Sequence, residues 1–312
     1  MKLDFSGERV MAVVAHPDDA ELLCAGTLAR ARSEGAAIAI CVLCRGEKGQ
    51  PAKPIRNLGA VRRREMRAAA EVLGAELFTG RWGDGELMDA DAPRVFLADV
   101  FRRFRPSLVL AHALNDYHPD HRAVAALVDV ATWFSASRGR VTRHPVLPAP
   151  AAIWHMDTIE LHGFEPGFHV DVSAWMPVKE RMLACHRSQL SRAGDSEFSP
   201  LLPLMRAQAG MRGMQAGVAA AEAFRVDAPE GEAGAADPLA VRGGGAEEVV
   251  PGLAGLTVGE EGVEVALAAV TADADKLVGE SADLLYHLIV LLRSKGLGLE
   301  DVARELERRH KS

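Results

Sequence analysis

The residues best suited to chemistry form two short clusters, Ala15-His16-Pro17-Asp18-Asp19-Ala20-Glu21 and Asp116-Tyr117-His118-Pro119-Asp120-His121. Imidazole and carboxylate groups are ligands that Zn²⁺ takes from proteins, and three such ligands leave a fourth position open for water. Zinc lowers the pKa of that water toward neutrality, and a neighbouring carboxylate can accept its proton. The two clusters together therefore predict a metal-assisted hydrolase.

Each cluster directly follows an apolar run that is typical of a buried strand, at residues 10–15 and 108–113. Similar runs and amphipathic stretches predict further strands at 38–44, 76–79, 153–155 and 169–172, and helices at 21–33, 61–73, 93–104, 122–134, 177–190 and 202–224. This alternation predicts an α/β fold, with a mostly parallel Rossmann-like sheet covered by helices. Ligands of such sheets lie at the carboxyl ends of the strands, where both clusters are expected.

Each cluster alone also has a purely structural interpretation. Pro17-Asp18 could form a turn before an acidic helix start, and Asp120 could cap a helix N-terminus. Two His/Asp clusters at equivalent strand ends, however, can converge on one cleft, as a metal site assembled from distant parts of the sequence requires. The pair therefore favours a metal centre.

The composition predicts a cytoplasmic protein that binds neither nucleic acid nor membranes. The net charge is −7, which gives no support to nucleic-acid binding. The longest apolar stretch, at 284–292, is too short to span a bilayer, and the N-terminus has charges where a signal peptide needs an apolar core. Cys41 and Cys44 lie three apart in a predicted strand and so point to opposite faces, which favours reduced, buried thiols.

The chain divides by composition into three parts. Residues 1–226 hold the strand–helix alternation, and residues 227–256 form a Gly-, Ala-, Pro- and Glu-rich linker. Residues 257–312 regain helical periodicity and predict a small all-α segment. Such a short segment is too small for a comfortable core of its own, so we expect it to dock on the first domain or to pair with a second copy.

The first domain resembles the PIG-L/LmbE-like zinc N-deacetylases over residues 8–225. The motifs AHPDDAEL and HPDH carry the resemblance. Further segments fit the pattern: the loop 45–49, Arg62 with Glu65, VDVS at 170–173, Ser188-Gln189, and AEAF at 221–224, which corresponds to a terminal helix. The resemblance implies hydrolysis of the acetamide of a small N-acetylglucosamine-type sugar or conjugate, with release of acetate and a free amine.

The resemblance also implies roles for individual residues. Zinc would be bound by His16, Asp19 and His121, and Asp18 would be the general base. Adjacent aspartates cannot face one metal equally, so a division into ligand and base is chemically sensible.

His118 would stabilise the charge on the amide oxygen and protonate the leaving amine, and Asp120 would orient His118. Arg62 is the strongest candidate for a substrate contact, because its fork of donors can bind sugar hydroxyls or a carboxylate. Arg45, in the loop after the second strand, could line the mouth of the same site.

The tail contains a second pattern of carboxylates, within one helical turn and then three residues apart: Glu260, Glu261, Glu264, Glu280 and Asp283. Paired helices could gather these acids around Mg²⁺. Residues 258–309 resemble the C-terminal two-thirds of phosphoribosyl-ATP pyrophosphatase, a MazG-like all-α enzyme. The first helix of that family and its lysine-bearing segment are missing, since residues 251–258 contain no lysine. The alternatives are therefore pyrophosphohydrolase activity or a dimerisation module that makes the protein a homo-oligomer.

Overall fold

The structure is a computed structural model that describes residues 3–159, 161, 163–190 and 200–226, together with residues 278, 281, 284, 304 and 308. The chain divides into two compact units, Met1–Glu248 and Val249–Ser312. The first unit contains every helix and strand discussed below. The five carboxylates expected to bind Mg²⁺, from Glu260 to Asp283, lie outside the described residues.

The first unit is built on a seven-stranded sheet in the order β3-β2-β1-β4-β5-β7-β6. The five strands on one side are parallel: β1 (Arg9–Val14), β2 (Ala37–Cys44), β3 (Glu76–Trp82), β4 (Leu108–Ala111) and β5 (Ala152–Met156). The remaining two, β6 (Phe168–Asp171) and β7 (Ala221–Arg225), extend the sheet by antiparallel pairing. The predicted α/β fold with a mostly parallel sheet is confirmed.

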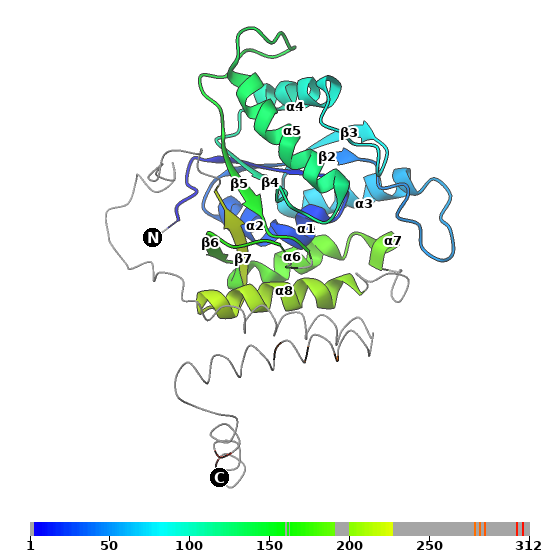
Figure 1. The fold of residues 1–312 in the computed structure, drawn as a ribbon, viewed down its shortest axis with the longest axis vertical. Helices are drawn as coiled ribbons and strands as arrows, with labels where there is room; N and C mark the ends of the chain where they lie inside the picture. The colour runs from blue at the N-terminus through cyan, green and yellow to red at the C-terminus, as the bar shows by residue number, and fades with distance from the viewer. Residues whose placement is uncertain are drawn as a thin grey trace. The chain divides into compact units, whose positions relative to one another are not determined.

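Helices cover both faces of this sheet. Figure 1 shows α4 (Asp91–Phe104) and α5 (Pro119–Ala136) on one face. The helices on the other face are α1 (Asp19–Leu23), α2 (Ala25–Ser33), α3 (Leu58–Leu73), α6 (Met176–Leu183) and α8 (Leu201–Ala216), with the short α7 (Arg187–Leu190) at one end. Leu97, Phe101 and Val124 pack from α4 and α5 onto Val13 and Val109 of the central strands, and all five are buried. This apolar layer fixes the strand ends that carry the two His/Asp clusters.

The helix expected over residues 21–33 is wrong in one respect, because the structure breaks it at Cys24. A buried ion pair occupies the break: Lys179 Nζ lies 2.5 Å from Glu222 Oε1 and donates to the Leu22 carbonyl at 2.9 Å. The Glu222 carboxylate also accepts hydrogen bonds from the backbone amides of Gly26 and Thr27, which are the free amides at the start of α2. These hydrogen bonds to the charged Glu222 carboxylate satisfy amides at the N-terminus of α2, so that a new helix can start directly after the break.

The helix expected over residues 202–224 is also wrong, because α8 ends at Ala216 and residues 221–225 form strand β7. Gly217 adopts a left-handed conformation, with φ of 69°, and terminates the helix. Alanine and glutamate favour helices intrinsically, but β7 gains pairing with both β5 and β6. Tertiary pairing therefore overrides local preference, and the AEAF segment is a strand rather than a terminal helix.

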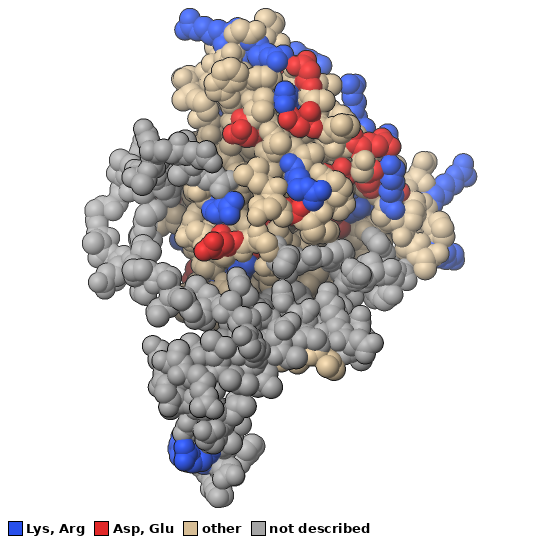
Figure 2. All heavy atoms as spheres, in the orientation of Figure 1, with Lys and Arg blue, Asp and Glu red and all other residues tan. Residues whose placement is uncertain are grey.

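The surface of the described residues mixes both signs of charge. On the face in Figure 2, Lys and Arg side chains lie among Asp and Glu. Lys48 pairs with Glu86 at 2.9 Å, and Arg140 pairs with Asp91 at 2.8 Å. No helix in the described part of the chain has the length and apolar character needed to cross a membrane. Cys41 and Cys44 are buried free thiols, as the sequence predicted.

Candidate metal and hydrolase site

The candidate site lies where the strand order reverses. Strands β1 and β4 are neighbours in the sheet, yet the chain runs from β1 to β2 on one side and from β4 to β5 on the other. The loops that follow β1 and β4 diverge there and leave a crevice, which is the usual ligand position of open parallel sheets. His16 and Asp19 follow β1, whereas His118 and His121 follow β4, so the expected convergence occurs.

The carboxylate of Asp19 is the centre of this cluster. Its Oδ2 atom lies 3.5 Å from His16 Nδ1 and 3.4 Å from His121 Nε2. Ligands bound tetrahedrally at zinc distances of about 2.0–2.1 Å are themselves about 3.3 Å apart. Asp19 Oδ2 is therefore spaced from each of the two histidines as one ligand of a tetrahedral ion is from another. Among the described residues, two groups with donor atoms within 4.8 Å of one another contain His121, namely His16–His118–His121 and Asp19–His112–His121. Burial opposes ionisation of Asp19, but neighbouring His121, His112 and His16 hold its pKa well below the usual value.

A second carboxylate supports each of the two histidines. His16 Nε2 lies 3.0 Å from Asp120 Oδ2, and His121 Nδ1 lies 3.0 Å from Asp116 Oδ1. A carboxylate on one ring nitrogen fixes the proton there and leaves the other nitrogen free to bind a metal. His16 thus presents Nδ1 and His121 presents Nε2, and these are the atoms closest to Asp19. The donor set fits a zinc ion.

Asp120 has a different partner from the one expected. Its carboxylate bonds His16 and accepts from the Gly85 amide at 2.6 Å, whereas its backbone amide donates to His118 Nδ1 at 3.1 Å. Asp120 therefore does hold His118, but through the main chain. Because Nδ1 of His118 accepts a hydrogen bond, the proton of the neutral ring is on Nε2. Burial, followed by the nearby His16 and His121, lowers the pKa of His118 and favours that neutral form.

Asp18 is held in an unusual conformation beside the cluster. Its φ is 104°, a left-handed value that is rare outside glycine and is found where the surrounding structure enforces it. Arg62 Nη2 lies 2.8 Å from Asp18 Oδ1, and the same guanidinium donates to the carbonyls of Pro17 and Gly46. Burial raises the pKa of the Asp18 carboxyl, with the positive charge of Arg62 opposing it. A raised carboxyl pKa suits a general base near neutral pH.

Sequence reasoning missed His112, and it placed Asp116 in the second cluster without giving it a role. His112 is fully buried at the end of β4, with Nε2 only 3.3 Å from Asp19 Oδ2 and its ring stacked on that of His121 at 3.9 Å. Burial and the neighbouring His121 lower the pKa of His112 to about 4, so the ring stays neutral. Both residues lie within ten positions of the HPDH motif and just after the strand, which is the signal that could have identified them.

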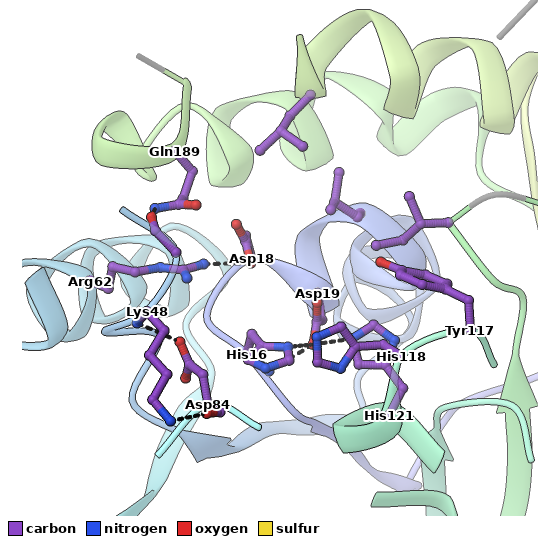
Figure 3. Close-up of a pocket in the computed structure, with 14 residues that line it drawn as sticks. His16, Asp18, Asp19, Lys48, Arg62, Asp84, Tyr117, His118, His121 and Gln189 are labelled. Carbon is purple, nitrogen blue, oxygen red and sulfur yellow. Dashed lines mark hydrogen bonds and ion pairs between the residues drawn. The ribbon is translucent and has the colours of Figure 1, made fainter. Parts of the chain in front are cut away.

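A pocket of about 330 Å³ opens onto this cluster. In Figure 3, His16, Asp19, His118 and His121 lie in the middle, with Tyr117 beyond the histidines on one side. The opposite side of the pocket is polar and is lined by Arg62, Lys48, Asp84 and Gln189. Of the two arginines expected to meet substrate, Arg62 lines the pocket. Arg45 is not among the described lining residues, and its side chain pairs with Glu47 at 3.0 Å instead.

Sequence profiles of two families match different parts of the chain. The PIG-L family, described as GlcNAc-PI de-N-acetylase, matches residues 11–132. The family described as phosphoribosyl-ATP pyrophosphohydrolase matches residues 247–310. Both resemblances noticed in the sequence are therefore confirmed.

Solved structures match the first unit over most of their own length. The conserved protein TT1542 from Thermus thermophilus is 32% identical with a TM-score of 0.61, covering 71% of this chain and 95% of that one. GalB, the 4-carboxy-2-hydroxymuconate hydratase from Pseudomonas putida KT2440, is 26% identical with a TM-score of 0.62, covering 73% and 100%. The N,N'-diacetylchitobiose deacetylase from Pyrococcus horikoshii, at 24% identity, a TM-score of 0.62 and coverage of 70% and 84%, shows the same fold.

The tail matches part of longer proteins. The histidine biosynthesis bifunctional protein HisIE of Xanthomonas axonopodis pv. citri is 74% identical over 53 residues, which is 17% of this chain. The chain spans 26% of the length of that relative. Likewise, it spans 57% of the phosphoribosyl-ATP pyrophosphatase of Pyrobaculum calidifontis. The similarity is strong but covers only a piece of each relative.

Proposed function

We propose that the first unit, a hydrolase of amide bonds that contains a PIG-L domain at residues 11–132, is a zinc-dependent N-deacetylase acting on N-acetylglucosamine-type sugars. The observation that carries the zinc assignment is the spacing around Asp19 Oδ2, with imidazole nitrogens of His16 and His121 at 3.5 and 3.4 Å. Supporting carboxylates on the far nitrogens of both rings favour the same assignment.

The reaction adds water across the amide, so that a C–O bond forms, the C–N bond breaks, and acetate and an amine leave. His16, Asp19 and His121 would hold a zinc ion, which when bound would supply Lewis acidity for hydrolysis. Asp18 would accept a proton from the attacking water while Arg62, 2.8 Å away, holds the carboxylate in place. His118 carries its proton on Nε2, so it can donate to the amide oxygen as charge develops and then protonate the departing nitrogen.

The polar side of the pocket suits the sugar. Arg62, Lys48, Asp84 and Gln189 offer donors and acceptors for hydroxyl groups. Asp84 is well placed because its carboxylate is fixed by the backbone amides of Gly46 and Lys48, at 2.7 and 2.9 Å. We therefore assign substrate binding to Arg62 and Asp84. Arg45 stays a weaker candidate at the mouth of the loop.

The test is release of free amine from a panel of N-acetylglucosaminides by the zinc-loaded protein. His121→Ala should lose both bound zinc and activity, whereas Asp18→Asn should retain zinc and lose about 10²–10⁴-fold in kcat, the usual contribution of a general base. Amine release, rather than loss of substrate alone, separates deacetylation from hydration, the reaction named for GalB. Full activity of Asp18→Asn would contradict the assignment of the base.

For residues 257–312 we propose association between copies of the chain rather than a second active enzyme. The matched segment spans 57% of the pyrophosphatase from Pyrobaculum calidifontis, and residues 251–258 contain no lysine to hold a triphosphate. Pyrophosphate release from phosphoribosyl-ATP in the presence of Mg²⁺ tests the alternative. Release that disappears in Glu261→Gln would establish the second activity and overturn the proposal.

A further inference from the structure

The catalytic pocket has an apolar wall that hydrolysis of an acetyl group does not need. Leu22 and Ile159 are buried, and Leu201 and Tyr117 are partly exposed, and all four line the pocket beside the metal cluster. These residues come from α1, the segment after β5, the start of α8 and the loop after β4. Four separate parts of the first unit thus contribute apolar surface to the pocket.

The position of this wall places it near the acyl end of the substrate rather than the sugar end. In Figure 3, Tyr117 lies on the opposite side of His118 and His121 from Arg62, Lys48 and Asp84. A secondary amide is trans, so its nitrogen substituent and its acyl chain point in opposite directions from the C–N bond. With the sugar among the polar residues and the amide carbon at the metal cluster, the acyl chain is directed toward Tyr117.

We propose that Leu22, Ile159, Leu201 and Tyr117 form an acyl-binding subsite that accepts linear acyl groups longer than acetyl. The substrate class is then an N-acyl amino sugar with a short aliphatic acyl chain. A polar or charged acyl group is disfavoured, because its polar atoms would lose water beside the aliphatic side chains of Leu22, Ile159 and Leu201. This inference rests on the proposed deacylase function of the same site.

The cations that line the pocket, Arg62 and Lys48, lie on its polar side, across the histidines from Tyr117. Arg62 is engaged by Asp18 and by two backbone carbonyls. Lys48 donates to the Asp84 carbonyl at 2.6 Å and to Glu86 at 2.9 Å. An anionic acyl group would have to break these contacts, whereas an aliphatic chain needs none of them.

The experiment compares glucosamine release from N-acetyl-, N-propanoyl-, N-butanoyl- and N-hexanoylglucosamine by the full-length, zinc-loaded protein. Each methylene buried against the wall should raise kcat/KM by up to about four-fold, equivalent to about 0.8 kcal/mol. The butanoyl substrate should therefore exceed the acetyl substrate. N-Succinylglucosamine, which has a carboxylate at the chain end, should fall below the butanoyl substrate.

A matched pair of variants tests the location of the subsite. Leu201→Asn should lower the ratio of butanoyl to acetyl kcat/KM several-fold, because a polar side chain replaces one part of the wall. Leu202→Asn is the control, since Leu202 is the next residue of α8, is equally half-buried and is not a lining residue. That control should leave the ratio unchanged.

Three results would overturn the inference. A steady fall of kcat/KM from acetyl to hexanoyl would reject it while leaving the deacetylase function intact. If circular dichroism showed that Leu201→Asn is folded and its butanoyl-to-acetyl ratio of kcat/KM were unchanged, the acyl chain of the substrate would bind elsewhere. If no substrate released amine although zinc was bound, the proposed function would itself fail, and the inference with it.

Discussion

At the scale of single residues, the site depends on carboxylates that touch no substrate. Asp116 Oδ1 lies 3.0 Å from His121 Nδ1 and also accepts the backbone amide of His118 at 2.9 Å. One buried oxygen therefore orients the proposed ligand and the proposed acid at the same time. Burial acts to raise the pKa of Asp116, but the contact with His121 outweighs it and lowers the pKa below the usual value.

Removing this charge should weaken metal binding without removing a ligand. Asp116→Asn is expected to reduce zinc affinity about 10- to 100-fold, the usual cost of losing such a supporting contact. Competition with a zinc chelator measures the affinity directly. Asp129→Asn, on an exposed face of α5, is the matched control and should bind zinc as the unaltered protein does. Equal affinities for the two variants would show that His121 is oriented by other contacts.

At the scale of elements, two glycines of the α8 region have different roles, because one lies inside the helix and the other ends it. Gly217 has φ of 69° and ends the helix, whereas Gly210 lies inside it, and an added Cβ would meet no atom within 4 Å at either position. The two sites therefore differ in backbone conformation rather than in available space. This difference makes them a clean pair for measuring what terminates α8 and allows β7 to form.

Alanine at these two positions should change stability with opposite sign. Gly217→Ala is expected to cost about 1 kcal/mol of unfolding free energy, because alanine disfavours the left-handed conformation. Gly210→Ala should add about 0.5–1 kcal/mol, because alanine loses less backbone entropy in a helix. Urea unfolding measures both. A shift in the same direction for the two variants would contradict this account of the helix end.

Asp99 is one of several α4 residues that hold the connection between α5 and β5, alongside Arg102 and Asp91. Asp99 Oδ1 accepts from the Arg143 amide at 2.9 Å and lies 3.0 Å from His144 Nδ1. Burial acts to raise the pKa of Asp99, but the contacts with His144 and the Arg143 amide outweigh it, so the pKa lies below its ordinary value of 3.8. The charged form is thus the one that the native state stabilises.

Acid should remove this contribution. Because the native pKa of Asp99 is lower than the unfolded value, its stabilisation is complete above the unfolded pKa and is lost as the pH falls through the native pKa. The difference in unfolding free energy between the protein and Asp99→Asn should therefore be larger at pH 6 than at pH 3. Denaturant titrations at the two pH values give this comparison. If the difference in unfolding free energy were larger at pH 3 than at pH 6, the native pKa of Asp99 would be raised rather than lowered.

At the scale of the whole molecule, all of the described site residues belong to the first unit. The residues from His16 to Leu201 that form the pocket lie within Met1–Glu248. Truncation after Val226 should therefore leave deacetylation per protomer unchanged, and it should convert an oligomer to a monomer if the tail associates. Amine release and light scattering on both forms test this. Loss of activity in a folded, zinc-bound truncate would show that the tail contributes to catalysis.

Much of this architecture could be predicted from the sequence because its signals are local. The apolar runs before His16 and Asp116 identified the central strands, and the paired His/Asp motifs predicted the cluster that the structure brings together. Strand β7 could not be identified in this way, since its partners lie fifty or more residues away and its alanines favour a helix. His112 was missed for a similar reason, because only the packing of β1 against β4 brings it to Asp19.

The position of β7 between β5 and β6 has a consequence for synthesis of the chain. Within the described sheet, β6 is an edge strand whose only neighbour is β7, although it precedes β7 by about fifty residues. During translation, β6 leaves the ribosome before its pairing partner β7, so its backbone can form these hydrogen bonds only after Ala221–Arg225 has been synthesised. Glu222 lies in β7 and accepts hydrogen bonds from the backbone amides at the start of α2, so this contact also forms only after β7 has been synthesised. The contacts that stabilise the break between α1 and α2, near Asp19, are thus completed by β7, one of the last described segments of the first unit to be synthesised.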